Sequence, residues 1–294
     1  MKKKKNKIEE ASGLGLKTVI VPGGKNLQYW KDIWKYRPLA MNLAKRDITV
    51  RYKQTVIGLG WSVISPVFNM LLMTFVFGSV AKMPSDGTAP YAVMVYAGLI
   101  PWTLFSKTFN TTSYAFLSGA GIMKKIYFPR IISPLGATLA TVIDSLISFV
   151  IMLVIILITH FTSGFTPSWH IVFAPLFFVF PILLGFFTGL FISPGSIRYR
   201  DINQILPFAL TAAQYITPVA YSFTEACNAM PEKLRGLYSL NPVAGAVNLF
   251  RWCIIPDNAF HWPSFWSMLV CIAVFIPLGF VSFRKGERTF VDLV

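Results

Sequence analysis

Apolar residues fall in long runs along most of this chain, and short polar segments separate them. A helix rises about 1.5 Å per residue, so a run of roughly 18 or more residues with few charges can cross the apolar core of a bilayer. Runs of this kind predict an all-α polytopic membrane protein with six transmembrane helices. The predicted spans are residues 56–80, 91–112, 131–158, 171–192, 205–221 and 265–283.

The connection between the fifth and sixth spans contains a shorter apolar segment. The stretch LNPVAGAVNLFRWCII (240–255) is apolar but too short to cross a bilayer. Asn241 followed by Pro242 is a helix-start signal, because an asparagine side chain caps free N–H groups and proline fits the first helical position. With PEKLRGLYSL (231–240) before it, this segment predicts re-entrant short helices between helices five and six.

The N-terminal part has a different pattern. Residues 1–28 form a basic tail, residues 29–55 predict an N-terminal amphipathic interfacial helix, and residues 56–294 form the transmembrane domain. Asp47 and Arg51 stand four residues apart, in the order that favours an ion pair on a helix. Between residues 41 and 55, a 3.6-residue period places Asn42, Lys45, Arg46, Thr49 and Lys53 on one stripe, and Met41, Ala44, Ile48, Tyr52 and Thr55 on the opposite one.

Composition and charge support membrane insertion. Hydrophobic residues make up 54% of the chain and charged residues 13%, against about 25% charged residues in soluble domains. A soluble enzyme is therefore excluded. Of the 27 Lys and Arg residues, 22 fall in the termini and loops of one predicted side, and four fall in the loops of the other. The net charge of +15 thus indicates a cytoplasmic face against anionic lipid rather than nucleic acid, and places both termini in the cytoplasm.

No nucleotide site accompanies these spans. The nearest match to a P-loop, VPGGKN (21–26), lacks the first glycine and carries Asn26 where a hydroxyl is required. Energy must come from another chain or from an ion gradient. A proton relay would need charged groups at mid-membrane, and Lys107 and Asp144 are the obvious candidates. They could equally form a structural ion pair or face water. No catalytic residue and no metal ligand set is predicted.

Several motifs together resemble the polysaccharide-export branch of ABC-2 type transporter permeases, and the resemblance covers roughly residues 30–290. No single motif is specific, but the combination is. The matching residues are Leu43, Arg46, Asp47, Ile48, Arg51 and Tyr52, then Leu59, Gly60, Trp61 and Pro66, with GLIPWTLFS (98–106), FPRIISPL (128–135), YRDINQILP (199–207) and LNP (240–242).

The resemblance implies a homodimeric permease that binds two copies of a separate ATP-binding-cassette subunit, which carries ATP and Mg²⁺. It also implies a channel for a polyprenyl-linked polysaccharide, with O-antigen favoured over capsule or teichoic acid. An ABC-2 permease for drugs or small lipids is the alternative. A membrane enzyme acting on polyprenyl phosphate is disfavoured, because the twelve acidic residues are scattered. The inner (cytoplasmic) membrane is the expected location.

In this family the N-terminal helix and the loop between spans two and three contact the ATPase. The loop SGAGIMKKIYFPR (118–130) is therefore a candidate for coupling, although its lysines could simply mark the cytoplasmic side. The predicted coupling residues are Gly121, Ile122, Lys124, Lys125, Ile126 and Tyr127 of this loop, with Arg46, Asp47 and Arg51 of the helix.

Aromatic residues recur at seven-residue spacing in two spans. Trp61, Phe68 and Phe75 share a face of the first span, and Phe208 and Tyr215 share a face of the fifth. Sugar rings stack on aromatic side chains through apolar C–H faces, so these residues are candidates to line a polysaccharide channel. Packing or lipid contact would produce the same stripes, and Trp61 could belong to the interfacial aromatic belt.

Overall fold

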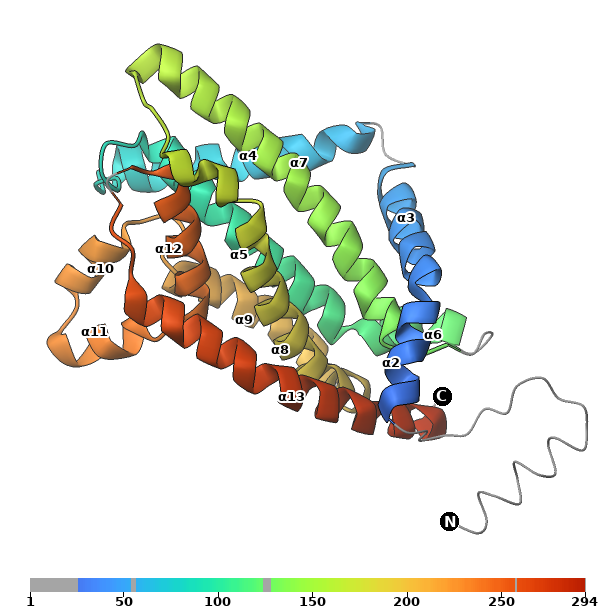
Figure 1. Cartoon of the computed structure of the whole chain (residues 1–294). Coiled ribbons are helices and arrows are strands. Elements are labelled where there is room, and N and C mark those ends of the chain that lie inside the picture. The colour runs from blue at the N-terminus through green and yellow to red at the C-terminus, as the bar shows by residue number, and fades with distance from the viewer. Residues whose placement is uncertain (1–25, 54–56, 124–127, 257, 294) are drawn as a thin grey trace, which may run out of the picture.

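The computed structural model describes residues 26–53, 57–123, 128–256 and 258–293, and the regular secondary structure in these ranges is helical, without a strand (Figure 1). Short 3₁₀ turns precede α4 and α8. The α-helices are α2 (Asn26–Lys35), α3 (Arg37–Lys53), α4 (Trp61–Met73), α5 (Tyr91–Ser113), α6 (Ala115–Met123), α7 (Ile132–Ser163), α8 (Val179–Arg198), α9 (Arg200–Ile216), α10 (Phe223–Ala229), α11 (Glu232–Ser239), α12 (Pro242–Ile254) and α13 (Trp262–Leu293).

Four helical segments in the described part of the chain are long and apolar enough to cross a membrane: 61–80, 132–163, 176–198 and 262–287. They correspond to the first, third, fourth and sixth predicted spans. The predicted second span is the 23-residue helix α5. The predicted fifth span, 205–221, is wrong in its bounds, because α9 ends at Ile216 after 17 residues. Thr217 precedes Pro218 and adopts an extended conformation, as a residue before proline prefers.

Helices α5 and α8 form the centre of the bundle. In α5, 14 of 23 residues are buried, while α7 and α12 pack against α5 and α13 packs against α8 (Figure 1). Two glycines of α8 allow this close packing. A Cβ atom at Gly185 would lie 2.6 Å from the carbonyl oxygen of Phe105, and one at Gly189 would lie 2.8 Å from that of Phe109. Small residues that let two backbones approach are typical of packed membrane helices.

The short apolar helix of the connection between the fifth and sixth predicted spans is present. The side chain of Asn241 accepts hydrogen bonds from the N–H groups of Val243 and Ala244, at 3.0 and 3.3 Å, and Pro242 is the first helical residue. With 13 residues, α12 is about 20 Å long, which is less than the roughly 30 Å apolar core of a bilayer. It is buried among α5, α8 and α13, so the predicted helix start is confirmed.

The predicted interfacial helix over 29–55 is two helices. The first, α2, ends at Lys35, and α3 begins at Arg37. Pro38 explains the break, because proline cannot donate the N–H that would continue α2 but fits the first turn of α3. The two described ends of the chain meet here, since the hydroxyl of Tyr29 on α2 donates to Glu287 on α13, at 3.1 Å (Figure 1).

The predicted apolar stripe of this region is also shifted. The buried residues of α3 are Ala40, Leu43 and Ala44, while Met41 is 66% exposed. The reason is tertiary packing, because α3 lies on α7 and approaches it most closely at Gly136. A Cβ atom at Gly136 would lie 2.9 Å from the Cβ of Leu43. The face that α3 buries is therefore selected by α7 and not by the plane of a membrane.

The first candidate span changes its winding near its end. The α-helix α4 passes at Thr74 into a seven-residue π-helical segment, Thr74–Val80. A π-helix has more residues per turn than an α-helix, and such segments are frequent at functional sites. The seven-residue spacing between Phe68 and Phe75 therefore crosses a change of helical period that the sequence pattern does not predict.

Candidate functional site

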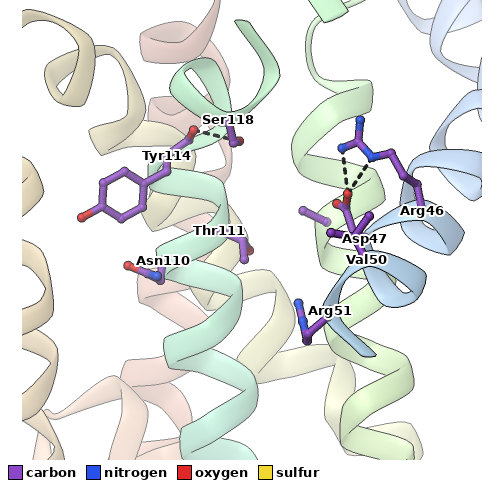
Figure 2. Close-up of a pocket in the computed structure, with 9 residues that line it drawn as sticks. Arg46, Asp47, Val50, Arg51, Asn110, Thr111, Tyr114 and Ser118 are labelled. Carbon is purple, nitrogen blue, oxygen red and sulfur yellow. Dashed lines mark hydrogen bonds and ion pairs between the residues drawn. The ribbon is translucent and has the colours of Figure 1, made fainter. Parts of the chain in front are cut away.

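A polar cavity of about 650 Å³ lies between α3 on one side and α5 with α7 on the other (Figure 2). Figure 2 shows Asn110 and Thr111 on α5, and Tyr114 directly after its last residue, opposite the side chains of α3. The ring of Tyr114 points away from the cavity, and its hydroxyl donates to the carbonyl oxygen of Asn203 on α9, at 2.7 Å. The cavity is lined by Arg46, Asp47, Val50, Arg51, Asn110, Thr111, Tyr114, Ser118 and Ala137.

The carboxylate of Asp144 on α7 is buried in the bundle and binds Arg51, which lines the cavity. It is only 6% exposed and accepts a hydrogen bond from the guanidinium of Arg51 and one from the hydroxyl of Tyr52, at 3.0 Å. The amine of Lys107 on α5 lies 3.9 Å away. Two cations and one phenol from α3 and α5 thus share one buried carboxylate of α7. Burial raises the pKa of Tyr52, and the carboxylate raises it further, so this hydroxyl stays protonated as a donor.

This geometry settles one alternative and corrects another prediction. Lys107 and Asp144 do form an ion pair, as one reading of the sequence proposed. The predicted pairing of Asp47 with Arg51 is wrong. Asp47 instead accepts two hydrogen bonds from Arg46, at 2.7 and 3.0 Å, on the exposed side of α3. Arg51 points to α7 because a buried carboxylate stabilises a guanidinium more than a solvated one does.

The cavity has the chemistry of a binding site for a polar or anionic group. Guanidinium groups can hold phosphate or carboxylate in a bidentate manner, and amide and hydroxyl side chains bind sugar hydroxyls. Arg46 and Arg51 are 49% and 41% exposed, so their remaining N–H groups are accessible from the cavity. Asn110 and Thr111 add neutral polar groups on the opposite wall.

The predicted channel residues all lie on exposed faces. Trp61 is the first residue of α4 and is 50% exposed, and Phe68 and Phe75 are 62% and 63% exposed. On α9, Phe208 and Tyr215 are 76% and 59% exposed. Helices α4 and α9 both contact α5. The structure therefore brings none of these aromatic side chains into the core of a single chain, and leaves them free to contact lipid, a second copy or a substrate.

The predicted coupling loop is described only in part. Gly121 and Ile122 lie in the last turn of α6, while Lys124, Lys125, Ile126 and Tyr127 lie outside the described residues. The other predicted coupling residues, Arg46, Asp47 and Arg51, line the polar cavity.

A second ion pair, which the sequence reasoning missed, lies at the opposite end of the bundle. Arg251 of α12 is completely buried, and its guanidinium lies 3.2 Å from the carboxylate of Asp86. It also donates to the carbonyl oxygens of Val219, at 2.7 Å, and Tyr221, at 2.9 Å. One side chain thus holds α12, the α4–α5 connection and the segment after α9 together.

Gly98 of α5 makes room for this arrangement. A Cβ atom there would lie 2.7 Å from the carbonyl oxygen of Val219 and 3.1 Å from the guanidinium of Arg251. A signal for the pair is present in the sequence, because an arginine inside the apolar segment 240–255 requires a buried partner. The sequence does not show which acidic residue is that partner, and so it does not identify Asp86.

Comparison with known proteins agrees with this architecture. A family model described as ABC-2 type transporter matches residues 39–255. The chain is 26% identical over 260 residues to an O-antigen export system permease protein RfbA of Klebsiella pneumoniae, with 87% of this chain and 95% of the relative covered. It is 27% identical over 217 residues to another RfbA of Klebsiella pneumoniae, covering 72% and 78%. It is 23% identical over 222 residues to an RfbA of Myxococcus xanthus, covering 75% and 82%.

Proposed function

Because this chain belongs to the ABC-2 type transporter family, we propose that it is the permease subunit of an exporter for a polyprenyl-linked cell-surface polysaccharide, with O-antigen as the first candidate. The chain is a multi-pass membrane protein and a transport subunit without an ATPase domain. Permeases of this family pair with ATPase subunits. The specific cargo comes from the relatives, which are named as O-antigen export permeases.

The choice of a glycan as cargo rests on one observation: the aromatic side chains of the candidate span 61–80 and of α9 are exposed. Phe68, Phe75 and Phe208 are each more than 60% exposed on helices that contact α5. Rigid aromatic faces bind sugar rings through C–H contacts that tolerate sliding, which a chain moving through a passage requires. A passage for a chain of sugars would use such faces repeatedly along its length.

A homodimer supplies the second wall of that passage. Helix α4 packs on the bundle through the buried residues Met70 and Met73, and few other residues of the candidate span 61–80 are buried. Most of its other residues are exposed, among them the apolar side chains of Val63, Phe68, Leu71 and Leu72. A second copy that covers this surface would enclose the aromatic residues of both α4 and α9. The same proposal includes six transmembrane spans, both chain termini in the cytoplasm, and a location in the inner membrane.

Two copies of the ATPase would engage the cytoplasmic side through α3 and residues 121–127. A movement of α3 would be transmitted to α7, because the two helices are in close contact and Arg51 of α3 binds Asp144 of α7. A displacement of α3 would therefore change the polar cavity and its ion pairs. ATP and Mg²⁺ act on the partner subunit in this scheme.

The test is to purify the chain with its partner ATPase and to reconstitute both in liposomes. Addition of a polyprenyl-diphosphate-linked glycan is expected to stimulate ATP hydrolysis several-fold, and Phe68→Ala is expected to reduce the stimulation. The bare polyprenyl lipid serves as the matched control and is expected to stimulate weakly. Equal stimulation by the bare lipid, or by small drugs, would assign the chain to small-molecule transport instead.

A further inference from the structure

A second cavity lies on the other side of α3 from the polar one. Its volume is about 560 Å³, within the range of roughly 300–1,000 Å³ that ligand sites in proteins occupy. It is formed where α2 and α3 change direction at Tyr36 and pass over the first turns of α7. The residues that line it are Ile33, Trp34, Arg37, Pro38, Ala40, Met41, Asn42, Ile132, Leu135 and Leu139.

The floor and walls of this groove are apolar. Ile132, Leu135 and Leu139 come from the first two turns of α7, and Ile33 and Met41 face them from α2 and α3. Leu139 is 40% exposed and Met41 is 66% exposed, so the groove is open along its length. Because α7 is long and apolar enough to cross a membrane, the groove begins where this candidate span begins and extends toward the hydrocarbon region.

The rim of the groove is cationic. The guanidinium of Arg37 lies 4.9 Å from the ring centroid of Trp34, which is 71% exposed. This cation–π contact holds the positive charge at the mouth of the groove, beside an indole of the kind that settles at membrane interfaces. The amide of Asn42 adds a polar group at the rim.

We propose that this groove is a binding site for an anionic phospholipid of the surrounding membrane. One acyl chain lies on Ile132, Leu135 and Leu139, and the phosphate of the headgroup binds Arg37. The positive charge of Arg37 favours an anionic headgroup. The headgroup lies at the start of α7, and the acyl chain continues along the apolar residues of that helix. Each Lys or Arg near an anionic membrane surface contributes attraction that a zwitterionic lipid does not provide.

The site is distinct from the path of the transported glycan. It lies across α3 from the polar cavity, and it contains none of the aromatic residues of α4 and α9. A lipid bound there would press α2 and α3 against α7 and would support the position of Arg51 at Asp144. It would act on the helix that carries both ion-pairing arginines without entering the cavity itself.

The proposal is tested on the purified full-length chain in detergent, by titration with phosphatidylglycerol and with phosphatidylcholine of the same acyl chains. Brominated phosphatidylglycerol is expected to quench the fluorescence of Trp34, measured as the difference between the wild-type protein and Trp34→Phe. Brominated phosphatidylcholine is expected to quench it several-fold less at equal concentration. Arg37→Gln is expected to weaken the binding of phosphatidylglycerol roughly fivefold, as loss of one interfacial charge implies.

Lys35→Gln is the matched control, because it removes an exposed cation from the same region that does not line the groove. It is expected to change binding less than twofold. An equal loss in both variants would show diffuse attraction and would overturn the site. Equal quenching by phosphatidylglycerol and phosphatidylcholine would also overturn the site. This comparison needs only the wild-type protein and Trp34→Phe. Displacement of the lipid by the partner ATPase would also overturn it, since the groove would then be a protein contact.

Discussion

Replacement of Asp144 by asparagine tests the ion-pair cluster that connects α3, α5 and α7. The change keeps the size of the side chain and removes its charge. Asp144→Asn leaves Arg51 without its closest anion and leaves Lys107 without the carboxylate that lies 3.9 Å away. Tyr52 keeps an oxygen acceptor in the asparagine side chain. The variant therefore isolates the electrostatic part of the contact.

The loss of stability expected for Asp144→Asn depends on how exposed Arg51 and Lys107 are. Two unit charges about 4 Å apart attract by roughly 4 kcal/mol at an effective dielectric constant near 20. Arg51 and Lys107 are 41% and 48% exposed, so water screens both, and water also compensates them when the carboxylate is lost. The value expected for a hydrogen bond to a charged group, about 1.5–3 kcal/mol, is therefore the better guide. A loss of about 2 kcal/mol corresponds to a fall of roughly 5 °C in melting temperature for a chain of this size.

The assay is a double-mutant cycle on melting temperature in detergent, with Asp144→Asn, Arg51→Met and the double variant. We expect the double variant to lose at least about 1 kcal/mol less than the sum of the single losses, because the partners contact each other. Arg46→Met is the control. Its partner Asp47 is on the surface of α3, so we expect a loss below about 0.5 kcal/mol and additivity with Asp144→Asn. Additive losses for Arg51 and Asp144 would refute the proposed cluster.

Three further predictions concern other parts of the molecule. Gly98→Ala is expected to cost about 1–3 kcal/mol by overpacking against the carbonyl oxygen of Val219. Gly236→Ala in α11 is the control, because its new Cβ would meet no atom within 4 Å; its melting temperature is expected to stay the same or to rise, since alanine favours a helix over glycine by about 1 kcal/mol. Phe68→Ala and Phe75→Ala are expected to slow glycan export while the melting temperature stays within about 2 °C, since exposed side chains contribute little to stability; normal export rates and chain lengths would contradict their role. Burial lowers the pKa of His261, so the unfolded chain takes up this proton first as pH falls, and stability is expected to decline below about pH 6.5. His261→Gln should reduce that decline, and an identical pH profile in both proteins would contradict this assignment.

Local signals in the sequence predict several elements well. The Asn241–Pro242 pair fixes the start of α12, because capping depends on residues adjacent in the chain. Proline likewise explains the end of α9, although the apolar pattern alone extends it to residue 221. The apolar runs identify the long helices because burial of apolar side chains and spanning of a membrane both require them. Helix α5 is the exception: it is long enough to cross a membrane, but it is not among the four segments that are also apolar enough, and 14 of its 23 residues are buried inside the protein.

The side-chain partners were harder to predict, because they join residues far apart in the chain. For Lys107 and Asp144, the sequence leaves an ion pair open as one alternative, since both are charged residues within apolar runs, and the structure shows that pair. A helix pattern shows only local partners, so it predicts that Arg51 pairs with Asp47, four residues away. The true partner, Asp144, becomes available only when α3 packs on α7. The π-helical end of the first span is not predictable from the sequence either, since no residue in TFVFGSV (74–80) signals it.

The central claim is that this chain forms a passage whose opening depends on ATP hydrolysis by a separate subunit. The most direct measurement is transport of a radiolabelled polyprenyl-linked glycan into liposomes that contain this chain with or without its partner ATPase. We expect translocation only when both chains and hydrolysable ATP are present, and none with a non-hydrolysable analogue. Translocation at the same rate by this chain alone, without ATPase, would contradict the account.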